Sequence, residues 1–387
     1  MEKVYRDALA FHKKYGGKLA MQSKMPLSGR SDLSLAYTPG VAQVSREIFR
    51  DRKSAYAYTM KRNSIAIVTD GSAILGLGNL GAQAALPVME GKAILFKKFS
   101  GIDAFPICLD TQDTEEIIRT VRYIAPGFGG INLEDISAPR CFEIEARLKK
   151  ELDIPVMHDD QHGTAVVVLA SLINALKLKG LSKKSTKVVI NGAGAAGGAI
   201  AKLLYKYGIT GLLVCDRRGL IFKGRRGLDG YKAELARLTR PAYANLVRGK
   251  IHDIPLAECL EGADVFIGVS TGNVVTAKMV QGMNVKPVIF ALANPIPEIF
   301  PHHAKAAGAF IVASGRSDFP NQINNALVFP GIFRGALDNR VKQITDAMLI
   351  RAAQNLASCV SNPSPRKIIP SIFSKDVVRA VSRAITK

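Results

Sequence analysis

One glycine-rich turn constrains the fold of this chain more than any other part of its sequence. Residues 187–190 predict a strand, and residues 192–197 follow directly with the spacing G-x-G-x-x-G before a helical pattern. The next predicted strand, residues 211–215, ends in front of Asp216, at the distance that a dinucleotide-binding βαβ unit requires. We therefore expect a doubly wound, Rossmann-type sheet whose crevice holds a dinucleotide.

The glycines of this turn let the backbone approach a pyrophosphate, whose charge the helix N-terminus stabilises. A turn that merely packs a helix closely on a strand is the alternative, and for a second match at residues 76–81 we prefer that alternative, because residues 69–71 separate it from its strand. We predict that the following residues bind the cofactor: Gly192, Gly194, Ala195, Ala196, Gly197, Asp216, Ser270 and Thr271.

The choice between NAD and NADP stays open at this point. Asp216 favours NAD, because a carboxylate accepts hydrogen bonds from ribose hydroxyls and repels a 2′-phosphate. Arg217 and Arg218 follow at once and could neutralise such a phosphate. On balance the sequence favours NAD.

A chain of 387 residues exceeds one ordinary core, so we expect two α/β domains. Residues 1–160 form the first, and residues 161–325 form the Rossmann-type NAD(P)-binding domain. We expect residues 326–387 to be helical and to pack back on the first domain. The strands predicted for the first domain are residues 64–68, 92–96 and 104–108, and those predicted for the second are residues 187–190, 211–215, 264–267, 287–290 and 309–312.

Charge and cysteine content bear on partners and compartment. The formal net charge is +21, but the basic residues are spread along the chain without interleaved aromatic residues, so we expect no specific nucleic-acid binding. The apolar run at residues 164–176 is too short to span a bilayer, and no signal peptide precedes it, so we expect no membrane association. Five widely spaced cysteines without a C-x-x-C pair suit a cytoplasmic protein.

Two pairs of neighbouring carboxylates lie just ahead of the glycine turn, Glu134 with Asp135 and Asp159 with Asp160. Each pair alone could be an acidic helix start, since helix N-termini favour negative charge. That interpretation does not explain why two such pairs recur together. Carboxylates gathered at one site need a cation, and hard divalent ions prefer oxygen ligands. We therefore expect Mg²⁺ or Mn²⁺ beside the dinucleotide.

Several short segments occur together in one order, and with them the chain resembles the malic enzymes, of the short prokaryotic type, over essentially its whole length. Each segment alone is weak, but the set is specific. The segments are DLSLAYTPGVA at 32–42, TDGSA at 69–73, PVMEGK at 87–92, GGINLEDI at 129–136, HDDQHGT at 158–164, ANP at 293–295 and NN at 324–325.

The resemblance implies oxidative decarboxylation of L-malate to pyruvate and carbon dioxide. It implies that Lys92 is the base for the C2 hydroxyl, with a lowered pKa, and that Asp159 orients it. It implies that Tyr37 protonates C3 of the enolate, although Tyr37 alone would be read as a packing residue. The remaining implied roles are metal ligation by Glu134, Asp135 and Asp160, carboxylate binding by Asn294 and Asn325, and loop shaping by His158 and His162.

Two alternatives to a malic enzyme remain. A malolactic enzyme is closely similar in sequence but releases lactate and retains its NAD. A non-catalytic nucleotide-binding protein would account for the positive charge, but it has no need of Lys92, Tyr37 and the carboxylates together. L-Malate is the expected substrate, and the resemblance implies a homodimer.

Overall fold

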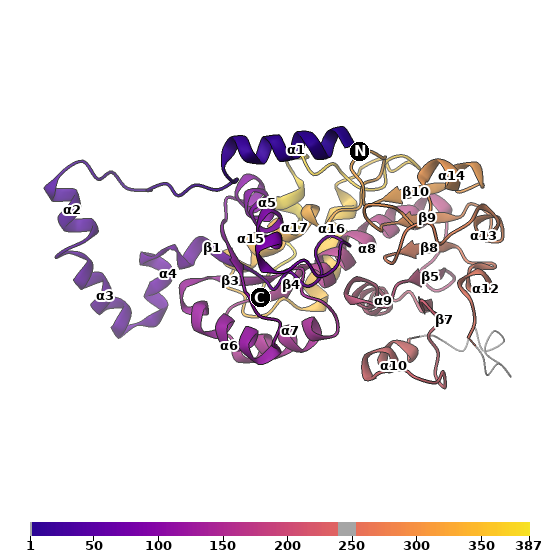
Figure 1. Cartoon of the computed structure of the whole chain (residues 1–387), viewed down its shortest axis with the longest axis horizontal. Coiled ribbons are helices and arrows are strands. Elements are labelled where there is room, and N and C mark those ends of the chain that lie inside the picture. Colours follow the sequence, from indigo (N-terminus) through magenta and orange to yellow (C-terminus); the bar gives the residue numbers. More distant parts are fainter. Residues whose placement is uncertain (1, 239–252) are drawn as a thin grey trace.

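The computed structural model describes residues 2–238 and 253–387, and it has two parallel sheets set side by side with helices around them (Figure 1). The first sheet has the order β2-β1-β3-β4, and the second has the order β10-β9-β8-β5-β6-β7. Every strand pair in both sheets is parallel except β6 with β7. The predicted α/β class with a doubly wound second sheet is confirmed.

The first sheet is covered by helices that follow its strands. Its elements are β1 (Ser64–Thr69), α5 (Ala82–Ser100), β2 (Asp103–Cys108), α6 (Thr114–Ile124), η3 (Ala125–Gly127), β3 (Gly130–Leu133), α7 (Arg140–Glu151) and β4 (Val156–His158). The strand predicted at residues 92–96 is wrong, because this stretch lies inside α5. Ala85, Met89, Ala93 and Phe96 recur at helical spacing and are all buried, so the apolar run is one face of a helix.

The second sheet carries the predicted glycine turn at the end of its central strand β5. Its elements are β5 (Lys187–Asn191), α9 (Ala195–Tyr207), β6 (Gly211–Asp216), β7 (Gly219–Leu220), α10 (Gly230–Ala236), α12 (Leu256–Leu260), β8 (Val265–Gly268), α13 (Ala277–Gln281), β9 (Val288–Ala291), α14 (Pro301–Ala306) and β10 (Ile311–Ser314). The chain leaves β5 towards β6 on one side and returns through β8 on the other. The carboxyl ends of β5 and β8 therefore flank a topological switch point, where such sheets bind ligands.

Helix α8 (Asp159–Lys179) joins the two sheets and forms much of the shared core. It is long and apolar enough to be compared with a membrane span, but 72% of its most apolar window is buried inside the protein. It packs against α9 and α16 (Asp346–Ser358). Since its apolar side chains already have partners in the chain, we interpret α8 as a core helix.

The C-terminal residues form η5 (Asn325–Leu327), α15 (Phe329–Asp338) and α17 (Val377–Ser382), and α15 packs against α5. The Phe96 ring of α5 lies 4.6 Å from that of Phe329 and 5.6 Å from that of Phe333. The expectation of helix to the end of the chain is wrong for residues 359–376, which are irregular. Three prolines in that segment prevent a continuous helix.

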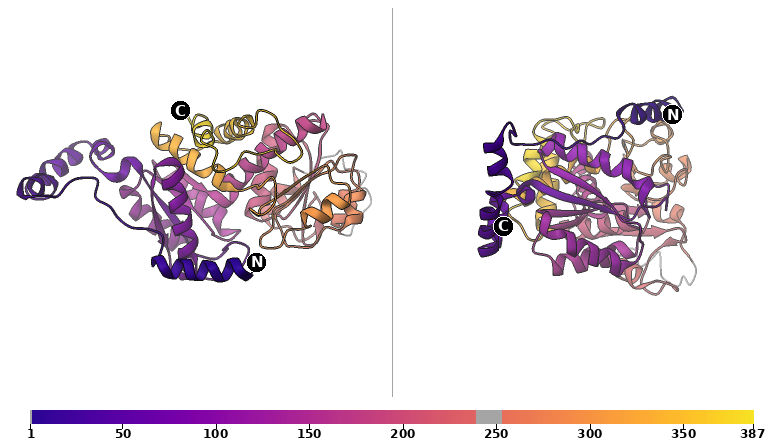
Figure 2. Two further views of the ribbon diagram at one scale, coloured as in Figure 1. Left: turned by 90° about the horizontal axis from the view of Figure 1, so that it is seen from above. Right: turned by 60° about the vertical axis from the view of Figure 1, so that its left-hand side comes forward.

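The N-terminal residues form helix α1 and then an arm that stands away from the two sheets (Figures 1 and 2). The elements of this N-terminal part are α1 (Glu2–Tyr15), α2 (Arg30–Ala36), α3 (Val41–Arg50), η1 (Arg52–Ser54), α4 (Ala55–Tyr58) and η2 (Met60–Asn63). Neither α2 nor α3 has a buried residue. Apolar side chains are instead open to solvent, with Leu35 exposed at 71% and Phe49 at 90%.

The phenylalanine cluster predicts a large loss of stability on truncation. Phe96→Ala should lower the free energy of unfolding by about 3–5 kcal/mol, because it leaves a cavity between α5 and α15. Phe373, exposed at 78%, offers a matched control, and Phe373→Ala should change that free energy by no more than about 0.5 kcal/mol. Urea unfolding of both variants measures the difference, and a Phe96→Ala loss below about 1 kcal/mol would contradict the packing described.

Candidate active site

The two carboxylate pairs meet because they follow neighbouring parallel strands. Strand β3 pairs with β4 in a register that sets Leu133 opposite His158. The next residues, Glu134 and Asp159, therefore leave the same edge of the sheet side by side. Helix α8 begins at Asp159, so its first turn adds a second carboxylate, that of Asp160.

Lys92 lies among these carboxylates at the centre of α5 and is 6% exposed. Its Nζ donates to Glu134 and, over 2.5 Å, to Oδ2 of Asp159. Burial alone would lower the pKa of Lys92, but the charges of Asp159, Glu134 and Asp160 outweigh burial and raise the pKa well above its ordinary value. The lowered pKa that the resemblance implied depends on a divalent cation beside Lys92; among the protein's own groups, Lys92 is the cation that holds the carboxylates together.

One ammonium is too little positive charge for four carboxylates. Burial, opposed by Lys92, raises the pKa of Glu134 and of Asp159 to about 7, and burial with the charge of Asp160 raises that of Asp135 to about 8. Oδ2 of Asp135 and Oδ1 of Asp159 are buried, and neither has a hydrogen-bond partner among the residues that the structure describes. Surplus negative charge and unsatisfied carboxylate oxygens fit a divalent cation with oxygen ligands.

The predicted metal ligands do not yet converge on one point. Across residues 2–238 and 253–387, no three His, Cys, Asp or Glu side chains gather closely enough to hold a metal ion as they stand. Oδ2 of Asp160 instead accepts a hydrogen bond of 2.9 Å from the backbone N–H of Asp135. Asp135 has a φ of +51°, a left-handed conformation that Asp tolerates better than most residues.

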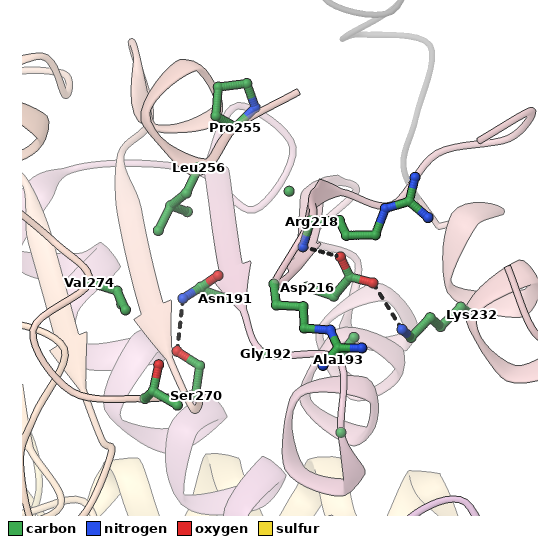
Figure 3. Close-up of a pocket in the computed structure, with 14 residues that line it drawn as sticks. Asn191, Gly192, Ala193, Asp216, Arg218, Lys232, Pro255, Leu256, Ser270 and Val274 are labelled. Atoms are coloured by element: carbon green, nitrogen blue, oxygen red, sulfur yellow. Dashed lines mark hydrogen bonds and ion pairs between the residues drawn. The ribbon is translucent and has the colours of Figure 1, made fainter. Parts of the chain in front are cut away.

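The predicted cofactor turn lines a cleft of about 620 Å³ at the switch point (Figure 3). Gly192 has a φ of +121°, and a Cβ there would lie 2.5 Å from the carbonyl oxygen of Val269, so only glycine fits. Helix α9 begins at Ala195 and includes Ala196 in its first turn, and its N-cap residue Gly194 lines the cleft, so a helix N-terminus adjoins the cleft. A Cβ on Gly197 would lie 1.7 Å from Gly192 O, so this glycine packs the helix onto the turn.

Other predicted cofactor residues line the same cleft. Ser270 and Thr271 follow β8, and the Nδ2 of Asn191 donates to Ser270 Oγ over 2.8 Å (Figure 3). Asp216 ends β6 as predicted, but its side chain is 8% exposed and already carries ion pairs with Arg225 and Lys232.

The helix that follows the glycine turn packs against the first domain. Ala195, in the first turn of α9, packs against the core of the first sheet. Asn294 lies on the loop that follows β9. A Cβ on Gly76 would lie 2.6 Å from the Asn294 carbonyl oxygen, so the second G-x-G-x-x-G match is a close-packed turn that faces this loop. On the other side, a Cβ on Gly163 would lie 1.9 Å from Oδ1 of Asp159 and 3.3 Å from Cβ of Asn325. The structure thus sets Asn325 beside Asp159, and Asn294 on the loop that faces the first domain.

Comparison with known proteins agrees with this architecture. The chain matches the families described as malic enzyme, N-terminal domain, over residues 16–149 and malic enzyme, NAD binding domain, over residues 161–387. The chain belongs to the malic enzyme family. It is 54% identical to the bifunctional malic/malolactic enzyme of Bacillus subtilis, over 98% of this chain and 92% of that protein. It is 53% identical to the NAD-dependent malic enzyme of Geobacillus stearothermophilus, over 96% of this chain and 76% of that protein.

A solved malic enzyme structure has the same fold. The NAD-dependent malic enzyme of Thermotoga maritima superimposes with a TM-score of 0.93 at 49% identity, and 98% of each chain is covered. Both halves of this chain are therefore arranged as in that malic enzyme.

Tyr37 is the one predicted catalytic residue of this malic enzyme that lies elsewhere. It follows directly on α2 and is 66% exposed. Helix α2 belongs to the arm that stands away from the two sheets (Figure 1). The sequence could not reveal this separation, because residues 32–42 belong to the arm and the direction in which the arm leaves the first sheet depends on tertiary structure. Within one chain, the structure does not bring Tyr37 to Lys92.

Glu298 is a buried carboxylate that the sequence analysis missed. It is 0% exposed, and its Oε1 accepts from the backbone N–H of Ser270 over 2.8 Å, while its Oε2 accepts from that of Ala293 over 3.0 Å. It therefore ties the loop after β8, which lines the cofactor cleft, to the loop after β9, which carries Asn294. A lone glutamate after Asn-Pro-Ile-Pro offered no sequence signal of this bridge.

Glu145, also missed, holds the corner between β4 and α8. Its carboxylate accepts from the backbone N–H of His158 over 2.9 Å, contacts Nε2 of His162 at 2.9 Å and pairs with Lys149 at 2.8 Å. His162 therefore helps to fix the corner between β4 and α8 through its contact with Glu145. His158 differs, because burial lowers its pKa to about 4 and neither of its ring nitrogens forms a hydrogen bond in the described residues.

Glu145 predicts a pH-dependent contribution to stability. Burial alone would raise the pKa of Glu145, but His162 and Lys149 lower it well below its ordinary value of 4.5. Its stabilising effect is therefore complete above pH 4.5 and is lost as the pH falls further. Glu145→Gln should lower the free energy of unfolding by about 1–3 kcal/mol at pH 7, and the difference from the unmodified protein should shrink below pH 4.5.

Chemical unfolding at several pH values measures this difference. Glu143, exposed on the same helix, supplies the control, since Glu143→Gln should show little effect at any pH. A Glu145→Gln deficit that stays constant from pH 7 to pH 3 would show that lost packing, not lost charge, is responsible.

Proposed function

We propose that this chain oxidatively decarboxylates L-malate to pyruvate and carbon dioxide, with reduction of NAD or NADP and with Mg²⁺ or Mn²⁺ as the required cation. One observation carries the proposal: a buried lysine is paired with carboxylates in the domain against which the helix of the dinucleotide turn packs. A binding module has no need to bury a lysine between two carboxylates, because burial of charge is costly. A lysine held at a fixed position can move a proton, as the oxidation of a hydroxy acid requires.

Lys92 is the proposed base for the C2 hydroxyl of malate. Oδ2 of Asp159 holds its Nζ in place, and the Phe329 ring lies 4.3 Å from that nitrogen on another side. Lys92 can accept a proton only when the surrounding negative charge is cancelled, since that charge raises its pKa. A divalent cation held by Glu134, Asp135 and Asp160 would cancel this charge and polarise the C2 oxygen of the substrate. Asn294 and Asn325 are proposed to bind the malate carboxylates with their amides.

Removal of Lys92 tests its role. Lys92→Ala should lower kcat for malate oxidation by at least about 100-fold, because general bases contribute that much or more. Binding of reduced nicotinamide cofactor, followed by its fluorescence, should stay within about twofold, because the cleft lies on the other domain. Lys98→Ala, an exposed position on the same helix, is the control for loss of charge. A folded Lys92→Ala protein that turns over normally would remove Lys92 as the base.

Tyr37 is the proposed acid for C3 of the enolate, and we propose that it acts across a homodimer. The arm carries exposed apolar side chains and has no buried residue in α2 or α3. Unpartnered apolar helices are stable when a second surface covers them, and homodimers of two-fold symmetry are the commonest solution. The arm of one protomer can then supply Tyr37 to the site of the other, whose own arm points away (Figure 1).

Mixed dimers test this arrangement. Tyr37→Phe and Lys92→Ala proteins should each be nearly inactive, but mixing and refolding them together should restore about a quarter of normal activity, because half of the dimers are mixed and each mixed dimer has one intact site. If Tyr37 acts within its own chain, no site in any mixed dimer is intact and activity stays absent. Sedimentation of each variant checks that both still dimerise.

A malolactic reaction is the second candidate, favoured by the 54% identity to a bifunctional malic/malolactic enzyme. The deciding assay supplies L-malate, NAD or NADP and Mn²⁺, and it follows reduced nicotinamide by absorbance while pyruvate and lactate are quantified. The malic reaction gives equal amounts of reduced cofactor and pyruvate, and a chelator abolishes both. Lactate without net reduction would mean malolactic chemistry.

The five cysteines are free thiols, which supports our proposal of a cytoplasmic enzyme.

A further inference from the structure

The carboxylate of Asp216 has no hydrogen-bonding capacity left. The Arg225 guanidinium binds both its oxygens, with Nη1 at 2.9 Å from Oδ1 and Nη2 at 2.5 Å from Oδ2. The backbone N–H of Arg218 also donates to Oδ1, over 2.9 Å. The Nζ of Lys232 donates to Oδ2, also over 2.9 Å (Figure 3). Two oxygens offer about four acceptor sites, and all four are used.

These bonds are not a loose surface pairing. The Asp216 side chain is 8% exposed and the Arg225 side chain is 4% exposed. Arg225 is held further by the carbonyl oxygens of Gly219, over 3.1 Å, and Leu220, over 3.0 Å. Bidentate arginine pairs of this kind are among the stronger ionic contacts in proteins. Ribose hydroxyls can therefore bind Asp216 only if a bond is given up, and Lys232, with a side chain 31% exposed, is the partner that can move.

The surroundings of Asp216 carry more positive than negative charge. Arg218 pairs with Asp253, at 3.0 Å from Nε to Oδ2, so these two charges cancel. Arg225 likewise offsets Asp216. Two cations at the cleft then remain, Arg217 and Lys232. Arg217 is exposed, and its side chain forms no hydrogen bond or ion pair within residues 2–238 and 253–387.

We propose that this adenosine subsite takes the 2′-phosphate of NADP, bound by Arg217 and Lys232, and that Asp216 stays paired with Arg225. The proposal deepens the proposed function, on which it rests, by naming the cofactor. A phosphate monoester carries about 1.5 to 2 negative charges at pH 7, which matches the two uncancelled cations. Asp216 suggested a preference for NAD because a free carboxylate accepts from ribose and an uncompensated one repels a 2′-phosphate. Its oxygens are occupied and Arg225 offsets its charge, so both grounds for that preference are lost.

Binding of cofactor fragments tests the subsite without any turnover. Adenosine 2′,5′-bisphosphate should bind the unmodified protein at least about tenfold more tightly than AMP, measured by calorimetry, because charge-assisted hydrogen bonds to phosphate are strong. NADPH should likewise bind at least as tightly as NADH. Arg217→Ala and Lys232→Ala should each weaken NADPH about tenfold and leave NADH within about threefold.

Lys223→Ala is the matched control, because Lys223 is exposed on the same segment and does not line the cleft. Its loss should leave the NADPH-to-NADH ratio unchanged, which excludes a general effect of net charge. NADH bound tenfold more tightly than NADPH, with a ratio unaltered by Arg217→Ala and Lys232→Ala, would overturn the proposal. Failure of malate turnover with intact bisphosphate binding would instead count against the proposed function alone.

Discussion

The buried ion pairs of Lys92 are the interaction on which the rest of the site depends. They join α5, the end of β3 and the start of α8 at one point, with Lys92 bonded to both Glu134 and Asp159. Removing one member of a buried ionic group leaves uncompensated charge and costs about 3–5 kcal/mol. Three separate elements are thereby fixed relative to one another, and any cation that enters the cluster meets carboxylates already held in place.

Much of the cofactor half could be predicted from the sequence, because its signals are local. A strand, a glycine turn and a helix follow one another within residues 187–207, and periodicity with turn chemistry identifies each of them. The position of Asp216 at the end of β6 was predicted for the same reason. Its ion pair with Arg225 was not, because the two residues meet through the fold of the β7 hairpin.

The catalytic half was harder, because its arrangement depends on tertiary packing. A short apolar run that includes Lys92 suits a strand or a helix equally, and burial of one face of α5 decides for the helix. Strands β3 and β4 are only four and three residues long and were not predicted, so the meeting of Glu134 with Asp159 rested on family resemblance. No pattern in the sequence around Tyr37 indicates that it lies on an arm.

Glu298 gives the two ligand loops a common anchor. Its two oxygens each accept a hydrogen bond from a backbone N–H, one from each loop. A shift of either loop alone would therefore leave one oxygen of this buried carboxylate without its hydrogen bond. A coupling through Glu298 would change the affinity for cofactor and for substrate by the same factor, as thermodynamic linkage demands. A redesign of either loop in isolation would alter both affinities, so the two specificities of the enzyme have to evolve together.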